Sequence, residues 1–328
     1  MEKEYMQRKD YIDICKVVAM FMVTWAHCAQ QISGMMFPKL LVSKDAFISV
    51  NMAIFMIASG LVMNLPKMRS TPFWEFFYSK VLRLLVPMTI WYFLLMMALY
   101  PKRLDYWETY WYLSAMFICL ITIRLLAQVI TSTFVICLLS IIVLLIMPFL
   151  EFERSCYMMP FLWVGYALRF LINRIDNKVL LLLVALYGIL YYYWDVRYSI
   201  YNCPFRICDV SQNSILFMIY RFVIGSVGSI AVISLIRIMV ESDRFKWIKI
   251  LAKYGQYTLV FYTMSFVLNA MLARLMWHIG VYITIPGLLD FVSCIISLFM
   301  MVLMYNFQKI VENKNVICQL LGVICRKS

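Results

Sequence analysis

Charged residues are scarce in this chain. Aspartate, glutamate, lysine and arginine make up 14% of its 328 residues, whereas a soluble domain carries about 25%. Hydrophobic residues make up 64% of the chain, and its mean hydropathy is +0.83. So few polar side chains cannot cover a water-soluble globule of this size. The composition therefore indicates a polytopic membrane protein.

Metal-binding patterns are also missing. The chain has ten cysteines and two histidines, without a CxxC pair or a Cys/His cluster at the spacing of a zinc site. Most of the cysteines lie in apolar runs, where cysteine behaves as a small buried hydrophobic residue. We therefore expect no metal. Cys203 and Cys208 share one polar loop, and the sequence leaves open whether they form a disulfide.

A nucleic-acid-binding arm is a third feature that the chain lacks. The formal net charge is +13, but no basic stretch stands apart from the apolar runs. In a membrane protein, an excess of Lys and Arg marks the cytoplasmic side and attracts anionic lipid headgroups. We therefore expect membrane lipids, and no nucleic acid, as partners. The first apolar run follows a charged start but has no small-x-small cleavage site, so we expect an uncleaved span.

Apolar runs of membrane-spanning length follow one another along the whole chain. A span needs about 20 mostly apolar residues, and short connections with turn residues separate the runs. We predict an all-α bundle of about ten transmembrane helices in one integral-membrane domain, residues 1–328, with short tails at 1–10 and 309–328. The predicted spans are 12–32, 47–64, 79–100, 110–126, 131–150, 157–173, 179–195, 214–239, 256–276 and 281–307.

The distribution of Lys and Arg predicts the orientation. Basic residues are concentrated before the first span and in every second connection, and such connections normally face the cytoplasm. We therefore place both termini in the cytoplasm. This orientation puts Asp13 and Lys16 near the cytoplasmic end of the first span and His27 towards its outer half.

The first predicted span carries polar residues where lipid requires apolar ones. Successive residues of a helix are rotated by about 100°, so the five polar positions of this span, together with Met20, fall within one stripe about 80° wide on the helix surface. Ionisable groups inside a membrane are costly and normally face a protein interior or a watery cavity. The stripe therefore predicts a functional feature, with a purely structural histidine as the alternative. We call it the polar seam; it comprises Asp13, Lys16, Met20, Thr24, His27 and Gln31.

Other candidates lie on later spans. Lys80 and Arg83 are one helical turn apart, and Arg is suited to bidentate phosphate binding. Positive-inside anchoring is the alternative and is favoured for Lys80. For Ser59, next to Gly60, close helix packing is the default interpretation. Arg221 and Asp290 lie at membrane depth, where structural pairing is the alternative to a role in a site.

Six short motifs occur in a fixed order between residues 11 and 265. The first is YIDICK, residues 11–16, followed after ten residues by His27. The others are FMIASGL at 55–61, KVLRLLVP at 80–87, WYLSAMF at 111–117, MPFLWVGY at 159–166 and GQYTLVFYTMS at 255–265. Together they resemble the acyltransferase-3 family of integral-membrane acyltransferases. The chain departs from the family pattern at three positions. Lys16 stands where the family has arginine, Val81 stands where it has a basic residue, and Ser265 stands where it has histidine.

The resemblance implies a membrane O-acyltransferase, commonly an O-acetyltransferase, in a bacterial plasma membrane. Such an enzyme moves an acyl group from acyl-CoA to a hydroxyl of a cell-surface glycan or lipid-linked sugar. It implies that His27 is catalytic, as a general base or as a transient acyl carrier. Lys16 and Arg83, and less clearly Lys80, would bind the phosphates of CoA, a donor substrate and not a permanent cofactor. We expect pocket-lining or packing roles for the other candidates: Asp13, Ser59, Trp111, Arg221 and Tyr262.

Two other classes of function stay open at this point. A transporter or flippase for a lipid-linked or small anionic substrate could use the seam residues, Arg221 and Asp290 as a proton relay or a translocation path. Transporters often contain internal repeats and broken helices, and neither is evident here. A non-catalytic scaffold would not need the seam. The sequence does not identify the acceptor, the acyl chain or the oligomeric state.

Overall fold

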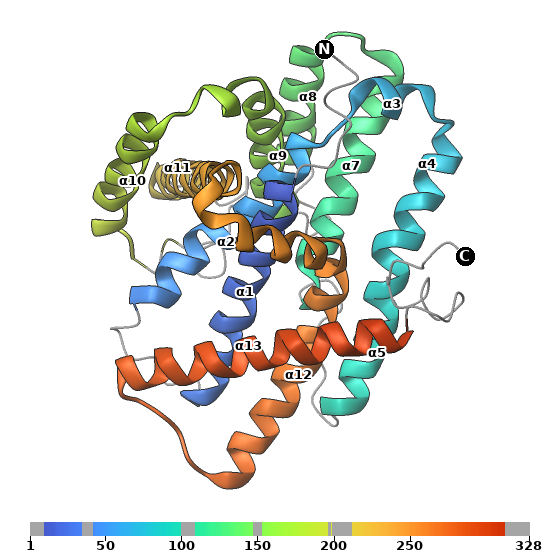
Figure 1. Ribbon diagram of the computed structural model, residues 1–328. Helices are drawn as coiled ribbons and strands as arrows, with labels where there is room; N and C mark the ends of the chain where they lie inside the picture. Colours follow the sequence, from blue (N-terminus) through green and yellow to red (C-terminus); the bar gives the residue numbers. More distant parts are fainter. Residues whose placement is uncertain are drawn as a thin grey trace.

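The computed structural model describes residues 10–34, 42–99, 109–146, 153–195, 198 and 212–311, and throughout these ranges the regular structure is helical (Figure 1). The all-α prediction is confirmed. The loop with Cys203 and Cys208 lies outside the described residues. Each predicted apolar run coincides with a helix. These helices are α1 (Asp10–Ile32), α2 (Val42–Leu61), α5 (Val86–Leu99), α7 (Trp111–Val129), α8 (Thr133–Ile146), α9 (Glu153–Leu171), α10 (Asn177–Tyr192), α11 (Gln212–Glu241), α12 (Thr258–Ile279) and α13 (Pro286–Val311).

Membrane-spanning length is met by some of these helices and not by others. Within the described residues, seven helical stretches are long and apolar enough to cross a membrane. Three apolar helices are shorter, at Asp45–Leu61, Thr133–Leu145 and Asn177–Tyr192. The chain therefore has the helices of a multi-pass membrane protein, while the count of ten spans and the cytoplasmic termini stay predictions.

Several short helical segments were not predicted. They are α3 (Leu65–Ser70), α4 (Phe73–Lys80), the π-helical segment η2 (Val81–Leu85), and the 3₁₀ segments η4 (Ile172–Arg174) and η7 (Asp243–Tyr257). Because α4, η2 and α5 are continuous, the third helical stretch begins earlier than predicted. Pro87 accounts for η2: it has no N–H to donate, and its ring excludes the Arg83 carbonyl four residues earlier. The Val86 N–H donates to the Val81 carbonyl, which closes the wider π turn.

Helix α1 runs through the middle of the bundle (Figure 1). It packs against α2, α11, α12, α13 and η7, and most of its residues are buried. Helix α13 crosses α1 at a steep angle (Figure 1), and Cys28 of α1 contacts Met300 of α13, sulfur to sulfur, at 3.6 Å. Asp13 is only 4% exposed. The polar seam therefore faces protein at its acidic end, as the cost of placing a carboxylate in lipid requires.

Helices α2 and α9 approach each other through two glycines. A Cβ atom on Gly60 would lie 2.0 Å from the Leu162 carbonyl oxygen, and one on Gly165 would lie 2.1 Å from the Ile57 carbonyl oxygen. Without side chains at these positions, the two backbones come into direct contact, as is common between membrane helices. Gly60 thus has the packing role that was the default interpretation of the Ser59-Gly60 pair.

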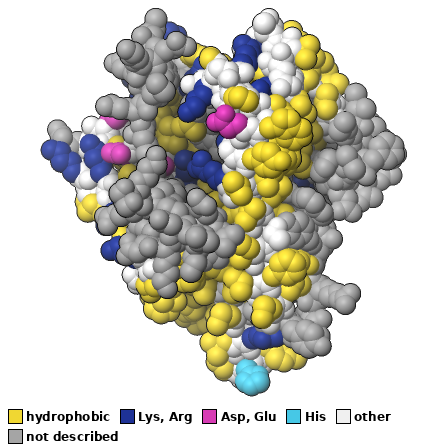
Figure 2. Space-filling model, turned by 90° about the vertical axis from the view of Figure 1, so that its right-hand side faces the viewer, with side chains coloured by type: hydrophobic (Ala, Val, Ile, Leu, Met, Phe, Trp, Pro, Cys, Tyr) yellow, Lys and Arg dark blue, Asp and Glu magenta, His cyan; other side chains and the backbone are white. Residues whose placement is uncertain are grey.

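Four arginines bind the carbonyl groups at helix C-termini, which have no partner inside their own helix. Arg69 Nη2 donates to the two carbonyls that follow α7, at 3.1 and 2.5 Å. Arg124 of α7 donates at 2.7 Å to the carbonyl that follows α3, the helix of Arg69. Arg169 donates at 3.0 Å to a backbone carbonyl just after α2, and Arg237 donates to a backbone carbonyl just after η4. On the face seen in Figure 2, most Lys and Arg side chains lie in the upper half.

The α2–α9 contact predicts opposite effects for two glycine substitutions. Gly165→Ala forces the helices apart, and overpacking of this kind costs about 1–3 kcal/mol. Gly188 of α10 meets nothing within 4 Å, so Gly188→Ala is expected to be neutral or stabilising by up to about 1 kcal/mol. Unfolding temperatures of both variants in detergent micelles check this difference. Equal stability of the two variants would contradict the contact.

Candidate active site

The acidic end of the seam is an ion pair covered by η7. Asp13 Oδ1 lies 3.4 Å from Lys16 Nζ, one helical turn further along α1. Asp13 is buried, whereas the Lys16 side chain is 26% exposed. Gly255 of η7 packs directly on Asp13, because a Cβ atom there would lie 2.3 Å from Asp13 Cβ. The carboxylate thus holds the Lys16 ammonium at the edge of the protein interior.

Lys80 and Arg83 lie at the junction of α4 and the π-helical segment η2. Lys80 Nζ lies 5.0 Å from the centre of the Phe76 ring, and the Arg83 side chain is exposed. The face that carries α4 and α5 is hollowed in its upper half, with Lys and Arg side chains at the edge of the hollow (Figure 2). Segment η2 packs chiefly against α4, α5 and α7.

His27 lies three helical turns beyond Lys16 and is half-buried. Its ring packs on Phe266 of α12, with 5.1 Å between the ring centres. Phe266 in turn contacts Tyr110 at 5.0 Å and Tyr262 at 5.4 Å, and Tyr262 contacts Tyr112 at 5.7 Å. We call Tyr110, Tyr112, Tyr262 and Phe266 the aromatic cluster. It places the predicted residue Tyr262 within two ring contacts of His27.

Two hydroxyl residues of the family motifs bond within their own helices. Ser59 Oγ donates to the Phe55 carbonyl at 2.8 Å. Ser265, which replaces a family histidine, is fully buried, and its Oγ donates to the Tyr262 carbonyl at 2.8 Å. Thr24 of the seam likewise donates to the Met20 carbonyl at 3.0 Å. These local bonds favour structural roles for the three hydroxyls.

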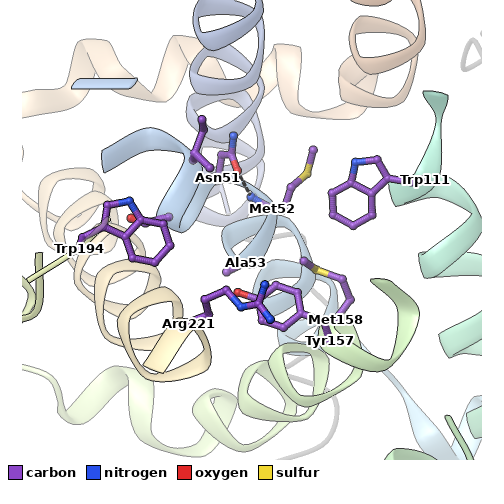
Figure 3. Close-up of a pocket in the computed structure, with 10 residues that line it drawn as sticks. Asn51, Met52, Ala53, Trp111, Tyr157, Met158, Trp194 and Arg221 are labelled. Atoms are coloured by element: carbon purple, nitrogen blue, oxygen red, sulfur yellow. Dashed lines mark hydrogen bonds between the residues drawn. The ribbon is translucent and has the colours of Figure 1, made fainter. Parts of the chain in front are cut away.

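A cavity brings together two predicted pocket residues, Trp111 of α7 and Arg221 of α11 (Figure 3). Arg221 is 2% exposed, and its guanidinium carbon lies 5.2 Å from the centre of the Tyr157 ring. Sequence reasoning missed Asn51 and Trp194, which also line the cavity. The amide of Asn51 inside the apolar α2 run was the available signal, because buried polar groups in membrane helices are costly.

The fold and the site define a class of protein. It is a multi-pass helical membrane protein, and its central helix carries ionisable residues inside the helix bundle. A family model described as an acyltransferase domain matches residues 9–306. The chain therefore belongs to the acyltransferase-3 family, as the six motifs predicted. No match was found among curated proteins or among solved structures.

The Gly255 contact predicts that a single methyl group disturbs the Asp13–Lys16 pair. In Gly255→Ala the new Cβ clashes with both the side chain and the backbone of Asp13, so η7 must move away from α1. We expect a loss of about 1–3 kcal/mol of stability, measured as a lower unfolding temperature in detergent micelles. Gly287→Ala is the matched control, because Gly287 meets nothing within 4 Å. An unchanged unfolding temperature for Gly255→Ala would contradict the contact.

Proposed function

We propose that this protein is an O-acyltransferase that moves an acyl group, acetyl in the simplest case, from acyl-CoA to a hydroxyl of a cell-surface glycan or lipid-linked sugar. The observation that carries the proposal is α1, which holds His27 and the Asp13–Lys16 pair on one enclosed helix. Family membership supplies acyl transfer as the reaction class. We further propose a bacterial plasma membrane as its location and surface polysaccharide as the material that it modifies.

His27 supplies the proton chemistry of this proposal. A sugar hydroxyl is a poor nucleophile, and imidazole, with an ordinary pKa near about 6.5, is a suitable base. The hydroxyl oxygen attacks the thioester carbonyl, His27 takes the hydroxyl proton, and the C–S bond breaks. The CoA sulfur then leaves and receives that proton. Phe266 covers one side of the imidazole, which limits access of water that would hydrolyse the thioester.

The donor binds, in this proposal, along α1. The CoA phosphates meet the cations Lys16 and Arg83, with Lys80 contributing, while Asp13 holds Lys16 in place. His27 lies eleven positions after Lys16, which is about 16 Å along a helix. The pantetheine arm therefore has to run beside the seam to bring the thioester to His27.

Substitution of His27 tests the catalytic role. We expect His27→Ala to lose transfer of labelled acetyl groups by about 100-fold or more, the range of general base catalysis, while binding of acetyl-CoA is retained. The matched control is His278→Ala, because His278 is the second histidine and is exposed on α12. Transfer at the wild-type rate by His27→Ala would exclude the role.

The same protein distinguishes a base from an acyl carrier. Wild-type protein is incubated with labelled acetyl-CoA without an acceptor and then denatured. Label that stays on the chain and is absent from His27→Ala identifies a carrier, and an unlabelled chain identifies a base. Release of CoA that depends on added glycan separates both from a transporter, which would move a substrate without cleaving the thioester.

Donor binding tests the cations. We expect Lys16→Met and Arg83→Gln each to weaken acetyl-CoA binding by about tenfold, since a charge-assisted hydrogen bond contributes about 1.5 kcal/mol or more. Lys16→Arg keeps the charge and restores the family residue, so it is expected to bind at least as tightly. Exposed cations of η7 provide the controls Lys249→Met and Arg244→Gln. Equal affinities in all of these variants, measured by isothermal titration, would contradict the assignment.

A further inference from the structure

Segment η7 (Asp243–Tyr257) presents cationic and apolar side chains together on the surface of the protein. It is the orange stretch between α11 and α12 that crosses α1 (Figure 1). Four of its fifteen residues are basic and one is acidic. We propose that η7 lies on the membrane surface and binds the headgroups of anionic phospholipids. The proposal does not depend on the transferase function.

The place of η7 in the chain puts it at a membrane surface. It continues directly into α12, and the joined stretch Arg244–Ile279 is 36 residues long. A span needs about 20 residues, and α12 alone supplies 22. The residues left over carry charges that are costly in hydrocarbon. Segment η7 therefore lies outside the hydrocarbon, at one end of α12.

The 3₁₀ geometry sorts the side chains of η7 into rows, because residues three apart are aligned in such a helix. The outer row consists of Trp247, Ile250 and Lys253. All three are exposed, Trp247 by 63% and Ile250 by 58%. The inner row consists of Ile248, Leu251, Tyr254 and Tyr257. Its members are buried or half-buried, so one side of η7 packs on the protein and the other faces outwards.

Exposed cations flank the apolar side chains of the outer row. They include Arg244 and Lys249, which lie close to this row in the chain. Glu241, the acidic residue at the end of α11, is engaged elsewhere, because its carboxylate lies 3.3 Å from Arg237. A phospholipid joins an anionic headgroup to apolar chains, and a surface that combines basic with large apolar side chains matches both parts. A soluble anion would leave the apolar side chains unused.

Contacts of the inner side fix the orientation of the outer row. Tyr254 contacts Tyr305 of α13, with 4.6 Å between the ring centres, and Gly255 packs directly on Asp13 of α1. These contacts hold η7 against the bundle, so the outer row keeps facing away from it. The segment proposed to meet the lipid is thus also the one that covers the buried carboxylate.

Quenching of tryptophan fluorescence by brominated lipids tests the proposal, because bromine quenches only a nearby indole. The protein is placed in nanodiscs of phosphatidylcholine and phosphatidylglycerol, in which either lipid is brominated on its acyl chains at the same mole fraction. The difference in emission between the wild type and Trp247→Phe isolates the signal of Trp247. We expect Trp247 to prefer phosphatidylglycerol about fivefold, since one Lys or Arg near an anionic surface contributes about that factor.

Variants assign the preference to η7. Arg244→Gln/Lys249→Met, each with and without Trp247→Phe, is expected to lose most of the preference for phosphatidylglycerol. The matched control is Arg174→Gln/Lys178→Met, which removes two exposed cations elsewhere and should keep it. An ionic strength of about 1 M, which screens charges beyond about 3 Å, should weaken the wild-type preference. If the η7 double variant does not fold, as its unfolding curve will show, the single substitutions carry the test.

Four results would overturn the proposal. They are equal quenching by the two lipids, no quenching of Trp247 by either lipid, an unchanged preference in the folded η7 variants, and displacement of phosphatidylglycerol by millimolar glycerol 3-phosphate. The last result would identify a site for soluble anions, since glycerol 3-phosphate has the phosphate without acyl chains. None of these results bears on the transferase proposal, because no acyl-CoA is present.

Discussion

The structure depends on enclosing one helix whose charges cannot face lipid. A carboxylate and an ammonium within α1 have to be surrounded by protein or water, and α2, α11, α12, α13 and η7 together provide that surrounding. The closest part of the enclosure is the contact of Gly255 with Asp13, where the absence of one side chain lets two backbones touch. The Asp13–Lys16 pair and His27 owe their placement to this packing. Their spacing along the helix follows from helical geometry alone.

Much of the fold could be predicted because span length and helical period are local properties of the sequence. The apolar runs coincide with helices. Of the stripe residues, Asp13, Met20 and Thr24 are buried, and Lys16, His27 and Gln31 are half-buried. Segment η2 could not be located by periodicity, since it arises from Pro87 acting on a carbonyl four residues earlier. Segment η7 was missed because its 3₁₀ geometry has neither the length nor the apolar pattern of a span. The glycine contacts of α2 with α9 depend on tertiary placement, although Gly60 itself gave a correct hint.

The site was predictable to a similar extent. Trp111 and Arg221 were singled out separately, one by its motif and the other by its membrane depth, and the fold brings both to one cavity. Arg83 was predicted to bind the same CoA phosphates as Lys16, and that shared role stays a prediction; Arg83 lies on segment η2, which packs chiefly against α4, α5 and α7. Trp194 could not be found from the sequence, because an indole near the end of an apolar run usually belongs to the membrane interface. Which residues share a cavity is decided by helix packing and not by spacing along the chain.

The arginines at helix ends change how the positive charge of this chain should be counted. Each helix C-terminus carries a partial negative charge of about half an electron, and Arg69, Arg124, Arg169 and Arg237 each direct donors at such an end. The formal net charge of +13 is unchanged by these contacts, because a helix dipole carries no net charge. The donors of these four guanidiniums are nevertheless engaged within the protein. Direct contacts with an anion from outside are therefore left to exposed cations, such as Arg83 and the lysines of η7.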